Sequence, residues 1–319
     1  MSRFRSTLLV VSVLLSTTPA VLAGSAEIAE RAGVIRQRVA GTTYSQELPV
    51  LARVQGTAFF RTFVSITNNT NTNGVTASFQ FSYTCVAAAC SPAGGFYRTT
   101  VQTITLPALS SFVQPDFIDY LNTQGLLQPG ANQGSIGTLL VTFASLPSSN
   151  GWEANVVART YNRLVESDAT QGTVGFAYNG SLFFDSADTT LVGYGHDTEA
   201  SPDIAGKIRT NIGVRNTDIN GTNQNMTVDI TCYDTATGAK VGNPITFADL
   251  RPGEVRQQAL FAAAGIPSTV TNVIIFVDVR NPTATSPTME GYVTLIEGQN
   301  TQDAALFTLL CADVNGCGN

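Results

Sequence analysis

The sequence predicts an all-β protein in which two tandem immunoglobulin-like β-sandwiches are joined by a β-hairpin connector and preceded by a signal peptide. Three observations predict this: an internal repeat, a period-two alternation of apolar residues, and regularly spaced turn residues. RTFVSITNNTNTNGVTASFQFSYTC, from Arg61, and RTNIGVRNTDINGTNQNMTVDITC, from Arg209, share a pattern and both end on a cysteine. The period is about one domain, so two copies of a small β domain are expected.

Residues 1–23 have the pattern of a secretory signal peptide. Arg3 and Arg5 form the charged start, residues 8–15 are apolar, and residues 21–23 form a small-residue cleavage site. Roughly 18 or more apolar residues are needed to span a bilayer, so this stretch is too short for an anchor. We expect a mature chain from Gly24 that is secreted or held at the cell surface or in the periplasm, without membrane insertion.

The predicted elements follow in order. Residues 24–44 carry helix formers with charges on all sides and are predicted to form a leader or short helix. From Leu48 the apolar period is two, which marks the first sandwich, 45–163; the second sandwich, 191–300, repeats this alternation. About seven short strands in about 110 residues are typical of an immunoglobulin-like sandwich. The inward-facing residues that correspond in the two copies are Thr62 and Thr210, Val64 and Ile212, and Cys85 and Cys232.

Further segments also correspond. TITLPALSSFV (103–113) matches PITFADLRPGEV (244–255), and each precedes a short apolar segment, 117–121 or 259–263, that is predicted to form one helical turn. The remaining strands are predicted at 136–143 and 154–161 in the first copy and at 272–279 and 291–297 in the second.

Residues 164–190 are predicted to join the sandwiches as a β-hairpin. TVGFAYNGSLFF alternates as a strand pair would, and Asn179 with Gly180 supplies a type I′ turn. A hairpin is stiffer than a Gly/Ser linker, so a fixed arrangement of the two sandwiches is expected. Residues 301–319 are predicted to be a C-terminal tail with a local disulfide.

Composition limits the partners. Charged residues make up 13% of the chain, the net charge is −6, and Lys207 and Lys240 are the only lysines. Nucleic acids and anionic membranes attract clusters of Lys and Arg, so neither is an expected partner. The expected partner is an extracellular protein or a glycan, and no cofactor is predicted. Arg61 and Arg209 recur at equivalent outward positions, where the expected role is a strand-face ion pair or packing of the aliphatic stem along a neighbouring strand.

The five cysteines of an exported chain are candidates for disulfides. Cys85 and Cys90 enclose four residues, and Cys311 and Cys317 enclose five. Three pairings of these four are possible, and proximity in sequence favours two local bridges. Cys232 is then a free, buried thiol that packs as a small apolar side chain.

The segments LPVLARVQG, RTFVSITNN, ITLPALSSF, VVARTYN, TQGTVGF and RTNIGVRN together resemble the tandem β-sandwich repeats of secreted, mostly uncharacterised bacterial proteins of acidobacterial type. The resemblance spans nearly the whole mature chain. It implies two immunoglobulin-like domains in an extracellular setting and brings no catalytic residues. The CVAAAC insertion and the cysteine-bearing tail depart from the pattern.

The sequence offers little for catalysis. His196, the only histidine, lies in a polar segment, and no serine occupies a G-x-S-x-G elbow. Carboxylate pairs for glycoside hydrolysis are conceivable at Asp116 and Asp119 or at Asp185 and Asp188, but helix-start and loop roles are commoner for such acids. We expect no enzymatic activity, with a carboxylate-based hydrolase as a distant alternative.

Asn216, Asp218 and Asn220, followed by Gly221, have the spacing of oxygen ligands in a calcium loop. The twelfth position holds Thr227 instead of glutamate. An Asn/Gly-rich turn between two strands explains the same residues, so both interpretations stay open.

The loop Cys85–Arg98 is the strongest candidate for recognition. A disulfide would lower the ordering cost of binding, and Phe96, Tyr97 and Arg98 add aromatic and cationic side chains. A lid over the sandwich end is the structural alternative. The predicted function is a structural or interaction module for adhesion or spacing at the cell surface, with a polysaccharide-binding module as the second hypothesis.

Overall fold

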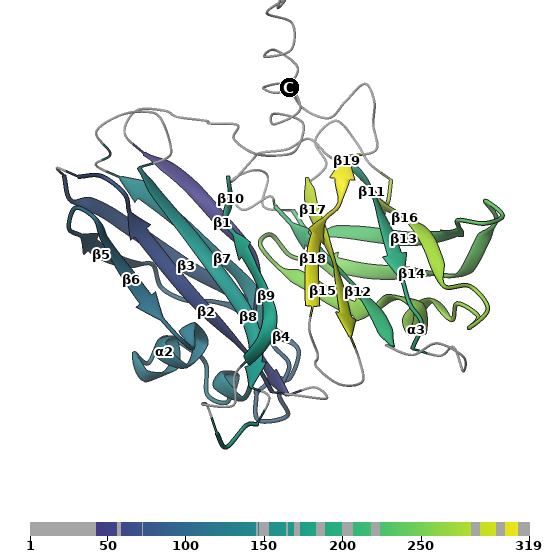
Figure 1. Ribbon diagram of the computed structural model, residues 1–319, viewed down its shortest axis with the longest axis horizontal. Coiled ribbons are helices and arrows are strands. Elements are labelled where there is room, and N and C mark those ends of the chain that lie inside the picture. The colour runs from purple at the N-terminus through teal and green to yellow at the C-terminus, as the bar shows by residue number, and fades with distance from the viewer. Residues whose placement is uncertain are drawn as a thin grey trace, which may run out of the picture. The chain divides into compact units, whose positions relative to one another are not determined.

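The computed structural model describes residues 43–55, 59–71, 73–144, 146, 153–163, 165–168, 173–182, 189–199, 207–217, 224–281, 288–297 and 304–311. They all belong to one compact unit, Gln37–Asn319. This part of the chain is all-β, as predicted, with antiparallel sheets and two short α-helices (Figure 1). None of its helices is both long and apolar enough to cross a membrane.

Strands β1–β10 are here called the N-terminal half. They form two sets that are connected where β1 pairs with β2, and the buried faces of both sets share one core. One set has the order β4-β3-β7-β1, with β5 also paired to β3 and β10 to β1; the other has the order β6-β2-β8-β9. The bounds are β1 Tyr44–Gln55, β2 Phe59–Asn68, β3 Val75–Cys85, β4 Gly95–Arg98, β5 Gln102–Leu106, β6 Ser110–Gln114, β7 Gly134–Ala144, β8 Ala154–Arg163, β9 Thr173–Asn179 and β10 Ser181–Leu182.

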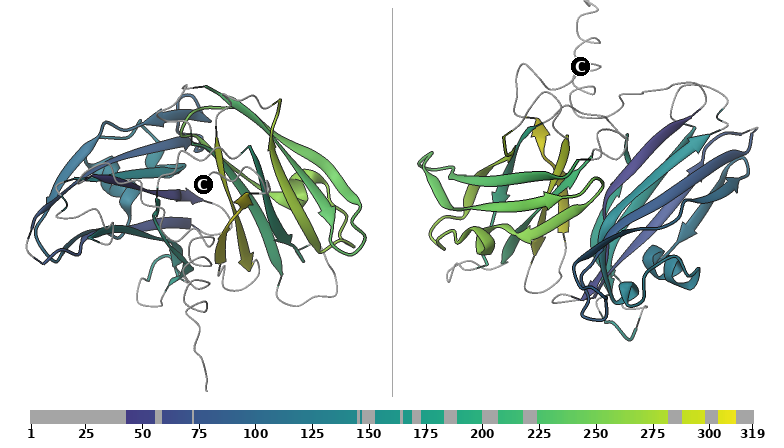
Figure 2. Two further views of the ribbon diagram at one scale, coloured as in Figure 1. Left: turned by 90° about the horizontal axis from the view of Figure 1, so that it is seen from above. Right: turned by 180° about the vertical axis from the view of Figure 1, so that it is seen from behind.

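Strands β11–β19 are here called the C-terminal half. One sheet has the order β14-β13-β16-β11-β19 and the other β15-β12-β17-β18. The green to yellow strands of Figure 2 belong to these two sheets. The bounds are β11 Thr190–His196, β12 Ile208–Asn216, β13 Met226–Asp234, β14 Lys240–Leu250, β15 Val255–Ala259, β16 Asn272–Val279, β17 Met289–Glu297, β18 Ala304–Thr308 and β19 Leu310–Cys311.

The two halves have the same strand order. The path β3-β7-β1 corresponds to β13-β16-β11, and β6-β2-β8-β9 corresponds to β15-β12-β17-β18. A short helix follows the same strand in each half, α2 (Phe117–Thr123) after β6 and α3 (Leu260–Ala264) after β15, where the helical turns were predicted. A 3-10 helix, η1 (Ala131–Gln133), precedes β7. The internal sequence repeat thus has a counterpart in the order of the strands.

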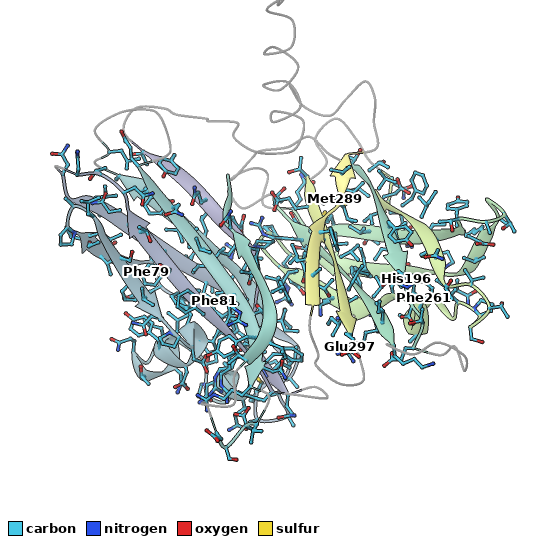
Figure 3. The ribbon with its side chains drawn as sticks, viewed as in Figure 1. Phe79, Phe81, His196, Phe261, Met289 and Glu297 are labelled. Atoms are coloured by element: carbon cyan, nitrogen blue, oxygen red, sulfur yellow. A yellow bond between two sulfur atoms is a disulfide. The ribbon has the colours of Figure 1, made fainter. Side chains whose placement is uncertain are left out.

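Alternating side chains fill one apolar core in each half, as the period-two pattern predicts. In β3, Ala77, Phe79 and Phe81 point inward, and the residues between them are partly exposed (Figure 3). In β13, Val228 and Ile230 do the same. Burial of such side chains is the main favourable contribution to folding.

Two polar residues recur inside both halves. Thr62 Oγ1 accepts a hydrogen bond from the backbone nitrogen of Ala52 at 2.9 Å, and Thr210 Oγ1 accepts one from that of His196 at 2.9 Å. Each threonine therefore links the first strand of its half to the second. All four of these residues belong to strands that correspond in the two halves, so the repeat extends to specific hydrogen bonds.

The second recurring residue is an asparagine at the end of the second strand. Asn68 Nδ2 donates to the carbonyl oxygen of Leu106 at 3.0 Å, and Asn216 Nδ2 donates to that of Leu250 at 2.9 Å. Both asparagines are fully buried. Buried carbonyls need hydrogen-bond partners. Each asparagine therefore holds the start of a loop, between β5 and β6 in one half and between β14 and β15 in the other.

Residues 173–182 do not form the predicted hairpin connector. β9 pairs with β8, whereas β10 pairs with β1, so the chain passes from one strand set to the other at Gly180. A Cβ atom on Gly180 would lie 2.5 Å from Val156 Cγ1, so only glycine fits without displacement. The Asn179-Gly180 dipeptide favours a tight turn between paired strands. β9 and β10 instead pair with other strands, and the sequence near the turn does not indicate that pairing.

A C-terminal tail was predicted for residues 301–319, but residues 304–311 of that segment belong to the sheets. β18 pairs with β17, and β19 pairs with β11. At the other end, β1 begins at Tyr44, before the predicted strand start at Leu48. The signal peptide 1–23 and residues 24–42 of the predicted leader lie outside the described residues.

Candidate functional site

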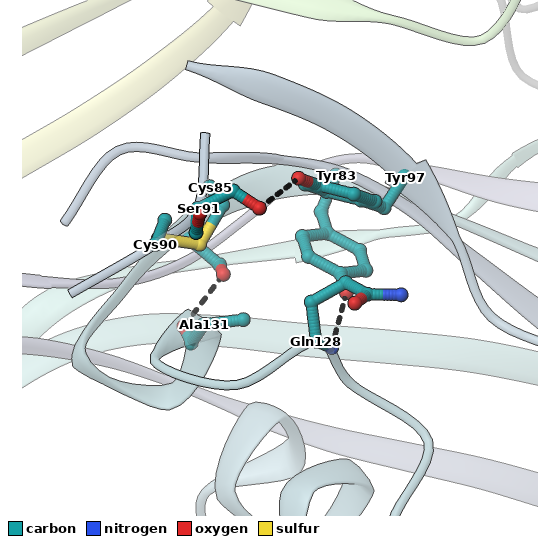
Figure 4. The surroundings of a disulfide bond; sticks show 8 residues. Tyr83, Cys85, Cys90, Ser91, Tyr97, Gln128 and Ala131 are labelled. Atoms are coloured by element: carbon teal, nitrogen blue, oxygen red, sulfur yellow. Dashed lines mark hydrogen bonds between the residues drawn. A yellow bond between two sulfur atoms is a disulfide. The ribbon is translucent and has the colours of Figure 1, made fainter. Parts of the chain in front are cut away.

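The loop Cys85–Arg98, here called the tip, is closed by a disulfide between Cys85 and Cys90 (Figure 4). Its last four residues form β4, which pairs with β3. The backbone nitrogen of Gly94 also donates to the carbonyl oxygen of Cys85 at 2.7 Å. The tip is therefore an extension of a sheet and not an open loop.

The two aromatic residues predicted for recognition are half-buried. The Tyr97 ring packs against Tyr83 with 5.7 Å between the ring centroids, and its hydroxyl donates to the carbonyl oxygen of Ser91 at 3.2 Å (Figure 4). Phe96 lies beside it and has the Arg98 guanidinium 5.7 Å from its ring centroid. Tyr97 thus contributes to the packing of the tip itself.

Arg98, the third residue predicted for recognition, contacts the C-terminal half. Its Nη2 donates to the carbonyl oxygen of Pro252, and Thr138 Oγ1 donates to that of Gly253 at 3.4 Å. Tyr292 of β17 packs with the N-terminal core. The two halves therefore meet through apolar packing and through donors directed at one turn.

An ion pair lies at the same junction. Glu47 Oε2 of β1 is 2.5 Å from Arg215 Nη1 of β12, and each side chain is only 1% exposed. Glu290 Oε2 of β17 is 3.3 Å from the same nitrogen. Burial raises the pKa of Glu47 to about 7, against the opposing charge of Arg215. Removal of either side chain would leave the other charge buried, which is strongly unfavourable.

Arg61 forms strand-face ion pairs. Its Nη2 pairs with Glu166, its Nε lies 3.6 Å from Asp116 Oδ2, and Arg53 Nε lies 2.9 Å from the same carboxylate oxygen. Both guanidinium groups lie over the Phe59 ring, at 4.5 Å for Arg61 and 5.0 Å for Arg53. Hydrogen bonding to Arg61 lowers the pKa of Glu166.

The residues considered for catalysis have structural contacts. Asp116 is the N-cap of α2, and its Oδ1 accepts from the Asp119 nitrogen at 3.2 Å. His196 ends β11 and is not part of a polar loop; its Nδ1 lies 2.7 Å from Asn272 Oδ1 (Figure 3). Residues 185 and 188 lie outside the described residues.

Of the predicted calcium ligands, Asn216 is described, and its Nδ2 donates to Leu250 and Gln224 carbonyl oxygens at 2.9 Å each. Asp218 and Asn220 lie outside the described residues. Within the described part of the chain, no group of three or more His, Cys, Asp or Glu could hold a metal ion.

Cys232 is a free, buried cysteine, as predicted, and burial raises its pKa to about 11. A thiol with so high a pKa is protonated and unreactive at neutral pH. The predicted Cys311–Cys317 bridge lies outside the described side chains.

A surface that sequence reasoning missed lies on the outer side of the sheet β14-β13-β16-β11. In one row across the strands Tyr194 pairs with Ile274, and Ile274 pairs with Tyr233; in the next row Val192 pairs with Phe276. Tyr194 is 50% exposed and Ile274 40%. We call these five residues the aromatic face.

The aromatic face has ordered rings. Tyr233 and Phe276 stand edge to face, with 5.6 Å between their centroids. The Tyr194 hydroxyl donates to Asn272 Oδ1, the same atom that the His196 ring contacts. Val273, Ile275 and Val277 of β16 are buried. Alternation within one strand gives no reason to connect Ile274 and Phe276 with side chains of β11 and β13. Only strand register brings these residues together.

No protein-family model matches the chain, and no curated protein matches it. Among solved structures it is similar to the crystal structure of a "putative secreted protein" from Parabacteroides distasonis, with 11% identity, 86% of this chain and 83% of the other covered, and a TM-score of 0.21. At this TM-score the similarity carries no argument about fold or function.

Proposed function

We propose that this chain is an exported, non-enzymatic interaction module in which two immunoglobulin-like β-sandwiches in tandem act as one rigid scaffold. Its role is attachment to, or spacing at, the cell surface. The strand order of each half supports the sandwich assignment, since two antiparallel layers around one core are what an immunoglobulin-like domain requires. The signal-peptide pattern of residues 1–23 supports export.

The observation that carries the proposal is the buried Glu47–Arg215 pair. Two domains that need only a tether can be joined by a flexible linker, whereas a buried ion pair between them holds one orientation. A scaffold with a fixed orientation presents its outer faces at a constant distance and angle. That property suits a spacer or an adhesion module.

The competing enzymatic hypothesis is a carboxylate-based hydrolase centred on Asp116. Its carboxylate caps α2 and lies 2.9 Å from Arg53, and both contacts are those of a structural acid. Release of reducing ends from cell-wall polysaccharide separates the hypotheses. We expect none above buffer; release that disappears in Asp116→Asn would favour the hydrolase. Asparagine is itself a good N-cap, so this variant retains the helix.

Co-sedimentation tests the interaction module directly. Protein produced from the full chain is mixed with washed cells of the source organism, and the bound fraction is measured after centrifugation. Saturable binding is expected, whereas an unrelated protein of similar isoelectric point should stay in the supernatant. If the protein also stays in the supernatant, attachment at the cell surface is ruled out.

A further inference from the structure

We infer that the aromatic face of the C-terminal half binds a neutral polysaccharide chain. This inference rests on the proposed function and adds the ligand class and the site. It places recognition on the side of a sheet, away from the tip that the sequence favoured.

The aromatic face has the shape to bind an extended ligand. Tyr194, Ile274 and Tyr233 lie side by side on β11, β16 and β13, so the row runs across the strands. Neighbouring strands are about 4.8 Å apart, which puts the two tyrosines roughly 10 Å from each other. Phe276 lies in the adjacent row, against Tyr233. An elongated ligand that follows the row can therefore contact aromatic side chains at two separate places.

The aromatic face also has the chemical groups that a sugar chain would contact. Sugar rings present C–H groups that pack on aromatic side chains, and hydroxyls at their edges that need hydrogen-bond partners. The aromatic face supplies the first, and Asn272, His196 and Thr231 supply polar groups at its border. Tyr194 is also held in place through Asn272 Oδ1. A held ring loses less conformational freedom when a ligand binds.

The charged side chains around the aromatic face favour a neutral ligand over an acidic one. Asp229, beside this face, is neutralised by Arg280, with 2.7 Å between Arg280 Nε and Asp229 Oδ2. The remaining charged groups of these strands are one lysine, Lys240, and three aspartates, Asp234, Asp249 and Asp278. The surface therefore has no excess of cations to attract an acidic polysaccharide.

A second copy of the chain is a weaker fit. Stable dimer interfaces bury about 800 Å² per subunit around a largely apolar centre. Here Ile274 and Val192 are the aliphatic members of the face, and the other three residues are aromatic, two of them with hydroxyl groups. Such a mixture suits an amphipathic sugar chain better than a dry protein interface.

Affinity electrophoresis of the full chain in gels that contain hydroxyethylcellulose, galactomannan or laminarin tests the inference. We expect at least one of these neutral polymers to retard the protein, and Tyr194→Ala to weaken that binding about tenfold or more. Tyr194→Phe should retain most of the binding because it keeps the ring. Thermal melting shows whether each variant is folded.

Two exposed or half-exposed aromatic residues elsewhere serve as matched controls. Phe307 is 54% exposed on β18, in the other sheet, and Phe96 belongs to the tip. Phe307→Ala and Phe96→Ala should leave binding unchanged. Loss of binding in Phe96→Ala but not in Tyr194→Ala would assign recognition to the tip and overturn the inference.

Other results would also overturn it. The first is that no neutral polymer retards the wild-type protein, and the second is that carboxymethylcellulose alone retards it. The third is that the wild type sediments as a dimer and Tyr194→Ala as a monomer. Each of these leaves co-sedimentation with cells as an independent result. Cell binding without polysaccharide binding therefore rejects the inference and retains the proposed function, whereas absent cell binding rejects the function.

Discussion

The corresponding sheets of the two halves have similar interiors and dissimilar outer faces. In the N-terminal half, one row across four strands consists of hydroxyl residues: Ser45, Thr142, Ser78 and Thr103. Ser45 Oγ is 2.7 Å from Thr142 Oγ1, and Ser78 Oγ is 3.0 Å from Thr103 Oγ1. These hydroxyls bond to one another along the sheet.

In the C-terminal half, a comparable row holds Tyr194, Ile274, Tyr233 and Lys240. Packing restricts the inner positions of both halves to side chains that fit one core, because interiors are close-packed. Outer positions are under no such restriction. The interiors of the two halves are therefore alike because packing constrains them, and specific contacts with a partner are to be sought on the outer faces, where the halves differ.

The largest expected effect on stability comes from the junction of the two halves, where Glu47 and Arg215 are buried. Arg215→Met should lower the free energy of unfolding by about 3–5 kcal/mol at pH 8, because it leaves the Glu47 carboxylate buried without the guanidinium. Urea unfolding followed by circular dichroism measures this.

Arg280→Met is the matched control, since it breaks an exposed pair with Asp229 and should have a small effect. The double variant Glu47→Gln/Arg215→Met should recover much of the loss. Equal losses in Arg215→Met and Arg280→Met would mean that the junction does not hold the halves together.

The same pair predicts a pH dependence. Burial raises the pKa of Glu47 from 4.5 to about 7, so the folded protein binds this proton more tightly than the unfolded chain. Stability from this group is therefore greatest below about pH 4.5 and falls as pH rises through 7, by about 3 kcal/mol in all. Urea unfolding between pH 5 and 8 should show the decline in the wild type. A Glu47→Gln variant with the same decline would contradict this origin.

The shared interior predicts equal effects in the two halves. Asn68→Ala and Asn216→Ala should each cost about 2–3 kcal/mol, because each removes the donor for at least two backbone carbonyls. Asn155→Ala, which loses only an exposed 3.4 Å contact with Asn69, is the control. Strongly unequal costs for Asn68 and Asn216 would show that the halves do not share this device.

The smallest expected effect compares the cysteines at the corresponding positions. Cys85→Ser/Cys90→Ser should cost about 2 kcal/mol, since it removes a bridge across a short loop. Cys232→Ala removes only a small apolar group and should cost at most about 1 kcal/mol. Thermal melting ranks them. If Cys85→Ser/Cys90→Ser melts at the wild-type temperature, the tip disulfide has no stabilising role.

Local pattern was sufficient for much of the fold. Period-two alternation located strands such as β16 at Asn272–Val279, and apolar segments located α2 and α3. It failed where pairing is non-local. Gly180 looked like the turn of a hairpin, and residues 304–311 looked like a tail, because nothing in either segment reports which distant strand it joins.

Some features of the candidate sites also follow from local sequence, whereas others depend on distant pairing. Alternation along the chain was enough to predict the all-β class, and a spacing of five residues was enough to predict the bridge between Cys85 and Cys90. Tertiary structure decided that Arg98 and Arg215 contact the other half, and that Tyr194 and Tyr233 lie on one surface. The physical reason is strand register, which depends on pairing among residues tens of positions apart and so cannot be read from any one segment.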